Sequence, residues 1–498
     1  MTLPSTPGEQ AVLEALAAMR AAVGEAHVHC PTGPDDAAYS SQQTDWRGRY
    51  HGWALAIVAP ADTDEVAAVV RVCARHGLSI VPQGGHTGLV GGGAPDASGR
   101  QIVLSLRRLR RILEVDTANL TLTAQAGCLL AEVQAAAAEA GLLFPLSLAS
   151  EGSCTLGGNL ATNAGGTQVL RFGNARDLCL GLEAVNAQGE VWHGLSGLRK
   201  DNTGYDLRHL LIGSEGTLGI ITAATLKLYP APRSQQAALL ACPSLDAALA
   251  LLKAARDVLD AQLTGFEVMG AYPLSLTLRH QPVQAAVLSA LGIDTATPGG
   301  NAAALPAWLV LLDAASPLPA SALQEQLEAL CAQAMDAGWA QQAALSQSDA
   351  QYRAMWALRE AIPLAEKSEA LMVKHDIGIP TSRIPRFMDD AAEALQEALP
   401  GVRIVCFGHM GDGNLHFNVQ GPAGMPASDF LKQHQTQVET IVYDLVQACE
   451  GSISAEHGVG QLKRHELAQR ADPVKLSWMR AIKQALDPLG LFNPGKLL

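Results

Sequence analysis

Apolar and polar positions change their period along the chain, and this change predicts a fold of mixed helices and strands. Short apolar runs at 55–59 and 79–82 predict two strands, with helical periodicity between them. Asp62 and Glu65 form a capping box at the start of that helix, and Gly77 ends it. Strand, helix and strand at this spacing indicate an α/β arrangement. Further strands are expected at 102–106, 121–126 and 220–228.

A proline-rich stretch at 229–232 predicts a domain boundary. Beyond it, helical and strand patterns alternate again, and we expect an antiparallel sheet with helices on one face. The expected strands lie at 237–241, 264–268 and 308–312, and the expected helices at 245–259 and 321–337. The stretch 295–306, rich in Ala, Gly and Pro, is expected to be an exposed loop. Long helices follow after about Phe430, so we expect three parts: a cofactor domain at 1–231, a substrate domain at 232–430, and a helical segment at 431–498 that returns to the first domain.

Composition restricts the class of protein. The 498 residues carry a formal net charge of -13 with no long run of like charges, which argues against nucleic acid as a partner. The nine cysteines have no Cys-x-x-Cys pair, which favours reduced thiols and a cytoplasmic location. We expect no signal peptide and no membrane-spanning segment, while peripheral attachment to a membrane stays open.

Three glycine-rich stretches, at 82–93, 145–166 and 213–220, are the first candidates for chemistry. Glycine allows a close approach of backbone N–H groups to an anion such as a phosphate. Neither a Walker A pattern nor G-x-G-x-x-G is present, and one such stretch alone is most often only a turn. Three of them in one half of the chain favour a cofactor held largely by backbone amides and hydroxyls.

Histidines and a carboxylate near the C-terminus are the second candidate. His409 and His416 flank a Gly-Asp-Gly turn, so a hairpin would bring them close enough to share one ion. In the second strand Asn414, His416 and Asn418 would face one side. Glu456 offers a third ligand for a divalent metal, and the neighbouring His457 would be left as a base. A lone histidine is more often structural than a ligand, so this interpretation depends on the whole set.

Taken in order, these motifs resemble FAD-binding oxidoreductases of the vanillyl-alcohol oxidase/p-cresol methylhydroxylase (PCMH) type. The similarity runs over about 53–496 and is closest to the branch of the D-lactate, glycolate and D-2-hydroxyglutarate dehydrogenases. It implies an α+β fold with a PCMH-type FAD-binding domain of two subdomains, an antiparallel-sheet cap domain for the substrate, and a C-terminal helical segment. It favours FAD held without a covalent bond, while a link through His86, as some relatives have in a Gly-Gly-His loop, stays open. It also implies that FAD contacts Pro82, Gly84, Gly85, His86, Thr87, Gly88, Leu89, Pro145, Ser153, Thr155, Gly157, Gly158, Asn159, Thr162, Asn163, Gly165, Gly216, Ile220 and Asn493.

The resemblance also implies roles for the second candidate set. His409, His416 and Glu456 would bind a divalent metal, zinc in this branch, and His457 would act as the base. Arg359 and Lys374 match the fifteen-residue interval of an Arg and a Lys that hold a distal carboxylate, although two solvated cations are the ordinary reading of such residues. Asn414 would also contact the substrate.

The expected enzyme is therefore an FAD-dependent dehydrogenase that oxidises a D-2-hydroxy acid to the 2-oxo acid. The match of Arg359 and Lys374 favours a diacid, D-2-hydroxyglutarate or D-malate. Pro363 stands where the family has a hydroxyl residue, and this departure leaves D-lactate and glycolate open. A metal-dependent hydrolase and a non-catalytic flavin subunit are the alternatives from other classes. An electron-transfer flavoprotein or a quinone would accept the electrons, and a homodimer is compatible with the sequence.

Overall fold

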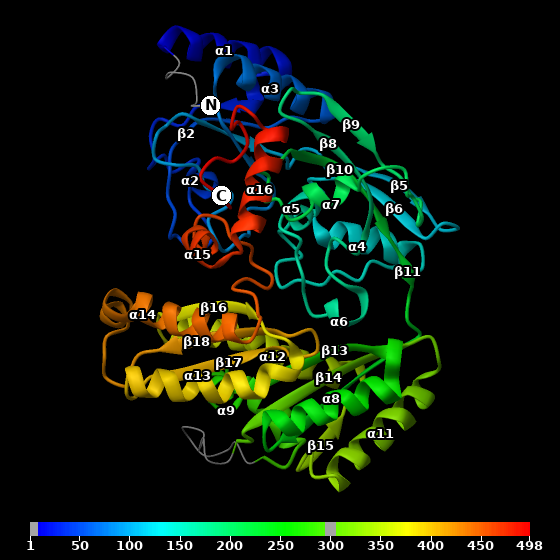
Figure 1. The fold of residues 1–498 in the computed structure, drawn as a ribbon. Coiled ribbons are helices and arrows are strands. Elements are labelled where there is room, and N and C mark those ends of the chain that lie inside the picture. The colour runs from blue at the N-terminus through cyan, green and yellow to red at the C-terminus, as the bar shows by residue number, and fades with distance from the viewer. Residues whose placement is uncertain (1–7, 294–304) are drawn as a thin grey trace. The chain divides into compact units, whose positions relative to one another are not determined.

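The computed structural model describes residues 8–293 and 305–498, so most of the expected loop at 295–306 lies outside the described residues. The chain divides into two compact units. Unit 1 contains residues up to 166, 173–231 and 456–498, and unit 2 contains residues 167–172 and 232–455. The mixed helix and sheet fold predicted from the sequence is confirmed (Figure 1).

Unit 1 is built from two main sheets. Its strands are β1 (Val28–His29), β2 (Ala54–Val58), β3 (Ile80–Gln83), β4 (Gln101–Ser105), β5 (Ile112–Asp116), β6 (Thr121–Gln125), β7 (Leu142–Leu143), β8 (Cys179–Val185), β9 (Val191–Gly194), β10 (Ile220–Lys227) and β11 (Tyr229–Pro230). Its helices are α1 (Glu9–Val23), η1 (Glu25–His27), α2 (Ser40–Gln43), α3 (Thr63–His76), α4 (Leu130–Glu139), α5 (Leu156–Ala161), α7 (Leu207–Leu211), α15 (Arg464–Arg470) and α16 (Pro473–Leu486).

The smaller sheet of unit 1 has the order β1-β2-β4-β3, and β4 pairs in parallel with both of its neighbours. Helix α3 connects the parallel strands β2 and β3, as the sequence predicts. The Asp62 side chain accepts a hydrogen bond from the Glu65 backbone N–H at the start of this helix. Gly77 ends it in the left-handed conformation, with φ 64°, where the absence of a Cβ atom removes the steric penalty.

The larger sheet of unit 1 is antiparallel, with the order β5-β6-β10-β8-β9. The C-terminal segment after α16 returns to the first sheet of the same unit. There the backbone N–H of Ile80 on β3 donates to the carbonyl of Leu491, and the N–H of Asn493 donates to the carbonyl of Ile80. The last helix therefore lies in the same unit as the N-terminal strands, and in Figure 1 it is the red helix α16.

Unit 2 is built on a single seven-stranded sheet. Its strands are β12 (Ser234–Cys242), β13 (Leu263–Gly270), β14 (Trp308–Ser316), β15 (Gln342–Leu345), β16 (Val373–Gly378), β17 (Arg403–His409) and β18 (Asn414–Gln420). Its helices are α6 (Val169–Phe172), α8 (Leu245–Leu259), η2 (Asp260–Gln262), α9 (Ala271–His280), η3 (Pro282–Gln284), α10 (Ala285–Ser289), α11 (Ala320–Asp336), α12 (Asp349–Glu369), η5 (Thr381–Arg383), α13 (Ile384–Ala398) and α14 (Ala427–Ala448).

The sheet of unit 2 has the order β15-β12-β14-β13-β17-β18-β16, and every neighbouring pair is antiparallel, as predicted. Helices cover both of its faces, however, so the prediction of helices on one face is wrong. Helices α8, α11, α13 and α14 share one buried cluster with the sheet, and α9, α10 and α12 share the other. The reason is that the central strands carry apolar side chains on both faces of the sheet, so helices must pack on each face to bury them.

The boundaries of the two units can be compared with the domain boundaries that the sequence predicts. The boundary expected near 231 coincides with the change of unit after Ala231. The expected third segment, 431–498, is itself divided, because α14 belongs to unit 2 and the chain enters unit 1 at Glu456. The physical reason is that apolar residues of α14, among them Val438 and Val442, are part of the core under the unit 2 sheet.

Candidate flavin cleft and polar sheet face

Glycine-rich stretches of unit 1 meet around a cleft of about 1080 Å³, a volume that includes its open mouth. The loop after β3 touches the second stretch directly, since a Cβ atom on Gly84 would lie 2.2 Å from the Thr155 hydroxyl oxygen. The third stretch, 213–220, packs against the first residue of the stretch 82–93. Gly216 has φ +69°, and a Cβ atom there would lie 2.4 Å from Pro82 Cγ. Only glycine fits these two positions, so the backbones of the three stretches can form one wall.

Most of the residues expected to contact FAD line this cleft. They are Pro82, Gly84, Gly85, His86, Thr87, Gly88, Thr155, Gly157, Gly158, Asn159, Thr162, Gly216, Ile220 and Asn493. Five others are not part of its lining: Leu89, Pro145, Ser153, Asn163 and Gly165. Two of these have side chains bonded within their own loops, because Asn163 Oδ1 accepts from the Arg176 N–H and the Ser153 hydroxyl donates to the Ser150 carbonyl. A role of these five in FAD binding stays a prediction.

A buried glutamate ties the segment that carries His457 to this cleft. Glu215 Oε1 accepts from the Val459 N–H and Oε2 accepts from the Gly460 N–H, both at 2.7 Å. His457 and Glu215 both line the cleft. The sequence pointed to the glycines of 213–220 but not to this role of Glu215, because its partners lie more than 240 positions away.

The cleft offers donors and acceptors that suit FAD. The Asn493 side-chain N–H groups donate to the carbonyls of Gly92 and Glu215, at 3.0 and 2.9 Å. Its Oδ1 atom is buried and has no hydrogen-bond partner among the described residues. A buried acceptor without a partner is unfavourable unless a ligand donor reaches it. Flavin and ribityl groups supply such donors, so the residues present fit this cofactor.

His86 is held in place at the first glycine loop. It has a left-handed backbone, with φ 59°, and its Nε2 atom lies 2.8 Å from the Thr44 carbonyl oxygen. Burial lowers the pKa of His86, although the hydrogen bond to Thr44 partly offsets this effect. The ring is therefore neutral near pH 7, with Nε2 carrying the hydrogen that it donates to the carbonyl.

In unit 2, the hairpin of β17 and β18 places both predicted histidines on one face of the sheet. His409 lies opposite Asn414 and Phe407 lies opposite His416 in the register, and the two imidazole centroids are 5.6 Å apart. Leu415, which alternates with these residues, is part of the core under the opposite face, as predicted. The sequence therefore predicted this hairpin and its polar face correctly.

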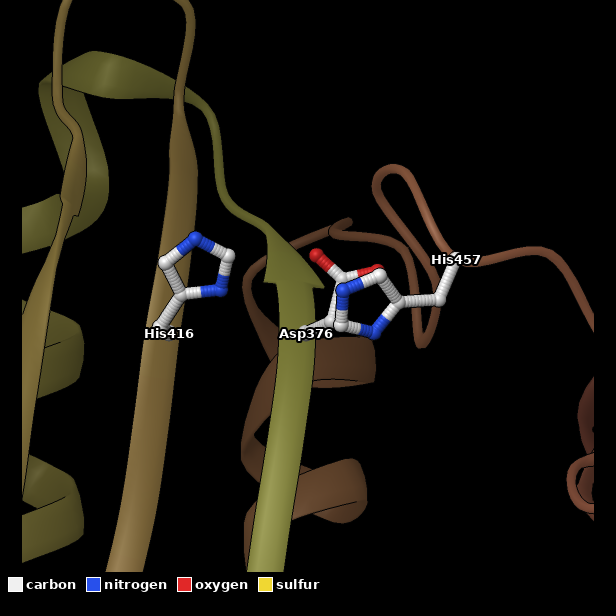
Figure 2. Close-up of side chains that lie close together, drawn as sticks. All are labelled: Asp376, His416 and His457. Carbon is white, nitrogen blue, oxygen red and sulfur yellow. The ribbon is translucent and has the colours of Figure 1, made fainter. Parts of the chain in front are cut away.

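The neighbouring strand β16 adds a carboxylate that the sequence analysis missed. Asp376 lies directly opposite His416 in the antiparallel register (Figure 2). Asn414 donates to Asp376 Oδ1 at 2.9 Å, and its own Oδ1 is buried without a hydrogen-bond partner in the part of the chain that the structure describes. Two imidazoles, a carboxylate and an amide oxygen on adjacent strands are a donor set that suits a divalent metal.

A second buried carboxylate, Glu267 on β13, lies on the other side of His409. Its Oε1 is 2.6 Å from His409 Nδ1, and its Oε2 accepts from Arg359 Nε at 2.7 Å. Burial alone would raise the pKa of Glu267, but His409 and Arg359 outweigh it and lower the value to about 2. The carboxylate fixes the hydrogen of His409 on Nδ1, which leaves Nε2 as the nitrogen that can bind a metal.

The two predicted substrate cations also lie on this face. Arg359 on α12 is buried, and its guanidinium carbon is 4.7 Å from the centroid of the Phe407 ring. Lys374 on β16 is about one-third exposed and donates to Glu366 Oε2 at 2.9 Å. Glu456, the third predicted metal ligand, follows Ala455 directly and begins the last segment of unit 1.

Comparison with known proteins decides the family. Residues 231–497 match the model of the C-terminal domain of FAD linked oxidases, and residues 54–194 match an FAD binding domain. The chain belongs to the FAD-linked oxidases. The predicted cofactor, FAD, and the predicted enzyme class, an FAD-dependent dehydrogenase, are thereby confirmed, and the flavin-free hydrolase has no support.

Individual relatives agree with this family. The chain is 39% identical over 458 residues to the D-2-hydroxyglutarate dehydrogenase of Xanthomonas citri pv. viticola. The aligned region covers 91% of each of the two chains. It is 36% identical to the mitochondrial D-2-hydroxyglutarate dehydrogenase of Bos taurus, over 91% of this chain and 78% of that one. Among solved structures, p-cresol methylhydroxylase is similar with a TM-score of 0.71 at 15% identity, over 100% of this chain and 98% of that one, which confirms the predicted PCMH-type fold.

The structure also bears on the membrane. None of the helices among residues 8–293 and 305–498 combines the length and the apolar character that crossing a lipid bilayer requires.

Proposed function

We propose that this FAD-dependent dehydrogenase oxidises D-2-hydroxy acids to 2-oxo acids, with D-2-hydroxyglutarate and D-malate as the favoured substrates. The observation that carries the proposal is the polar face of unit 2, where two histidines and two cations lie among buried carboxylates. Oxidation of a 2-hydroxy acid requires a Lewis acid at the hydroxyl, which a metal on the histidines would supply. It also requires cations that bind the carboxylates. The names of the two relatives supply the same substrate class.

The metal in this proposal binds His409 and His416, with Glu456 as the third ligand. The hydrogen bond from His409 Nδ1 to Glu267 supports it, because metal-binding histidines commonly donate their other N–H to a carboxylate. Asp376 is an additional oxygen donor on the same face as His416. A divalent ion such as zinc would supply Lewis acidity that lowers the pKa of a bound hydroxyl.

The remaining chemistry falls to His457 and to FAD. His457 lines the flavin cleft, and in the proposal its neutral imidazole takes the proton of the substrate hydroxyl. Bound FAD supplies the acceptor for the hydrogen and the electron pair that leave carbon 2. Arg359, Lys374 and Asn414 would hold the substrate, and a fixed orientation is what makes such a transfer efficient.

Anaerobic flavin bleaching tests the proposal. The protein with its FAD is mixed with D-2-hydroxyglutarate, D-malate, D-lactate or glycolate, and the flavin absorbance is followed in a stopped-flow instrument. We expect fast bleaching by the D-acids, slow bleaching by the matching L-acids, and loss of bleaching after treatment with a chelator. If no D-2-hydroxy acid reduces the flavin, the proposed activity is wrong. Full activity without a metal would instead remove only the metal from the mechanism.

Three further parts of the proposal concern the surroundings of the reaction. The electrons would pass from the flavin to an electron-transfer flavoprotein or a quinone. The enzyme would work in the cytoplasm and would form a homodimer. Reoxidation of the reduced flavin by a quinone analogue and by a purified electron-transfer flavoprotein separates the two acceptors, and sedimentation measures the oligomeric state.

A further inference from the structure

Glu366 on α12 is a buried carboxylate that the proposed reaction does not use. Its side chain is 2% exposed, and both of its oxygens have partners. Oε1 accepts from Asn418 Nδ2 at 2.6 Å, and Oε2 accepts from Lys374 Nζ at 2.9 Å. A glutamate is rarely buried to this extent unless it is paired, so these two contacts hold the Glu366 carboxylate in place, although Lys374 itself is about one-third exposed.

The ion pair lies on the polar face that carries the metal ligands. Lys374 is opposite Asn418 in the register of β16 and β18, and the next residues on the same face are Asp376 and His416. Two residues along a strand advance the chain by roughly 7 Å. The ammonium of Lys374 and the carboxylate of Glu366 are therefore within reach of the tail of a small acid whose hydroxyl is bound near His416.

The second cation of the face is paired in a different way. Arg359 uses Nε for its hydrogen bond to Glu267, and a guanidinium has five N–H donors, so four others can serve a carboxylate. Lys374 has a single charge, and Glu366 neutralises it at 2.9 Å. Between Arg359 and Glu366 the same side of α12 carries Pro363, which offers a tail no hydrogen-bond donor.

We propose that Glu366 is the residue that sets the preference of this enzyme for the tail of its substrate. By neutralising Lys374, Glu366 weakens the binding of 2-hydroxy acids with a carboxylate tail relative to acids with an uncharged tail. This inference rests on the proposed function, because it concerns the same polar face and the same class of acid. Glu366 would then be a specificity-determining residue, and its single charge would control the ratio of the KM for diacids to the KM for acids with an uncharged tail.

The substitution Glu366→Gln tests this role. The amide has almost the same shape and can still accept from Asn418, but it no longer neutralises Lys374. We expect the KM for D-2-hydroxyglutarate and D-malate to fall about 10-fold, the effect of roughly 1.4 kcal/mol, while the KM for D-lactate changes less than about 2-fold. The value of kcat should change little for either class, because the charge acts on the bound tail and not on carbon 2.

Two more variants complete a charge cycle. Lys374→Met leaves Glu366 as an unpaired negative charge, so the KM of the diacids should rise by about 10-fold or more relative to D-lactate. The double variant, E366Q with K374M, removes both charges and should move this KM ratio from the K374M value back toward the wild-type value. A merely structural role of Glu366 would instead change kcat and KM for all acids together.

A matched control lies on the same helix. Glu369 is also a partly buried glutamate in an ion pair, but its partners are Arg279 and His280. Glu369→Gln should leave the ratio of the KM for diacids to the KM for D-lactate unchanged. If E366Q leaves that ratio unchanged while the wild-type flavin is still bleached by D-acids, the inference is wrong and the proposed function stands. If no D-acid bleaches the wild-type flavin, both are wrong.

Discussion

Replacing Glu267 with Gln is the sharpest test of the metal site, because this carboxylate touches both His409 and Arg359. Gln has one acceptor oxygen, so it cannot accept from His409 Nδ1 and from Arg359 Nε in the way the two carboxylate oxygens do. Its N–H group would favour the imidazole tautomer with the hydrogen on Nε2, which is the nitrogen needed for a metal. The loss of such a second carboxylate lowers metal affinity by about 10- to 100-fold, or roughly 1.4–2.7 kcal/mol.

The same substitution also leaves a buried guanidinium without its counter-charge. The free energy of unfolding should therefore fall by about 3–5 kcal/mol, the range for a broken buried ion pair. FAD content should stay close to one per chain, because the flavin cleft is formed by residues of unit 1 and Glu267 belongs to unit 2. The variant is thus expected to be yellow, less stable and poor in metal.

The assay is competition with a chromophoric chelator, followed by metal analysis of the dialysed protein and by flavin absorbance. Asp313→Asn is the matched control. Asp313 is a buried carboxylate on β14 of the same sheet, and it accepts from the side chains of Thr264 and Trp356 rather than from a histidine. D313N should retain the metal. Equal metal affinity of E267Q and the wild type would refute the role of Glu267 in orienting His409.

Three further predictions concern unit 1. His457→Ala should slow anaerobic flavin reduction by about 10²- to 10⁴-fold, the usual contribution of a general base, while the flavin absorbance of the purified protein stays unchanged; an unaltered rate would exclude His457 as the base. We predict a non-covalent flavin, and the hydrogen bond between His86 Nε2 and the Thr44 carbonyl supports this because it occupies one of the two ring nitrogens; acid precipitation should release all FAD into the supernatant, whereas a flavin that stays on the pellet would show a covalent bond. Burial lowers the pKa of Lys496 to about 8, while Asp96 partly opposes the shift. The unfolded chain therefore binds more protons than the folded one between pH 8 and 10.5, and the free energy of unfolding should rise with pH across this window by up to about 3 kcal/mol; urea titrations of Lys496→Met should lack this rise.

Elements with a local signal were predictable from the sequence. The helix between Asp62 and Gly77 was readable because its cap and its last residue are fixed by neighbouring backbone groups. Helix α8 was predicted at 245–259, where it is found, since its apolar stripe matches the helical period. Strands β8 and β9 were not predicted, and the order of the five-stranded sheet could not be read, because pairing between distant strands leaves no local pattern.

The same distinction explains which site residues were found. The glycine-rich stretches were found because their composition alone indicates a backbone that can approach a ligand or another segment closely. His409 and His416 were found because only six residues, with a glycine turn among them, separate the two in the sequence. Glu215, Glu267 and Asp376 were missed, because each acts through a partner that only the register of the sheets or the docking of a distant segment determines. A buried acid of this kind looks like any surface acid in the sequence.

The two cations expected to hold the substrate are each paired with a buried glutamate, and the two pairs have different consequences. Glu267 holds Arg359 and also His409, so its removal must disturb the metal ligand together with the cation. Glu366 holds Lys374 and Asn418 and makes no bond to either histidine, so its removal should change the charge around the tail alone. Metal content should therefore fall in E267Q and stay constant in E366Q, whereas the ratio of diacid to D-lactate KM should change in E366Q. If both variants lost the metal to the same extent, the face would behave as one rigid network, and the separation of metal binding from tail recognition would be untenable.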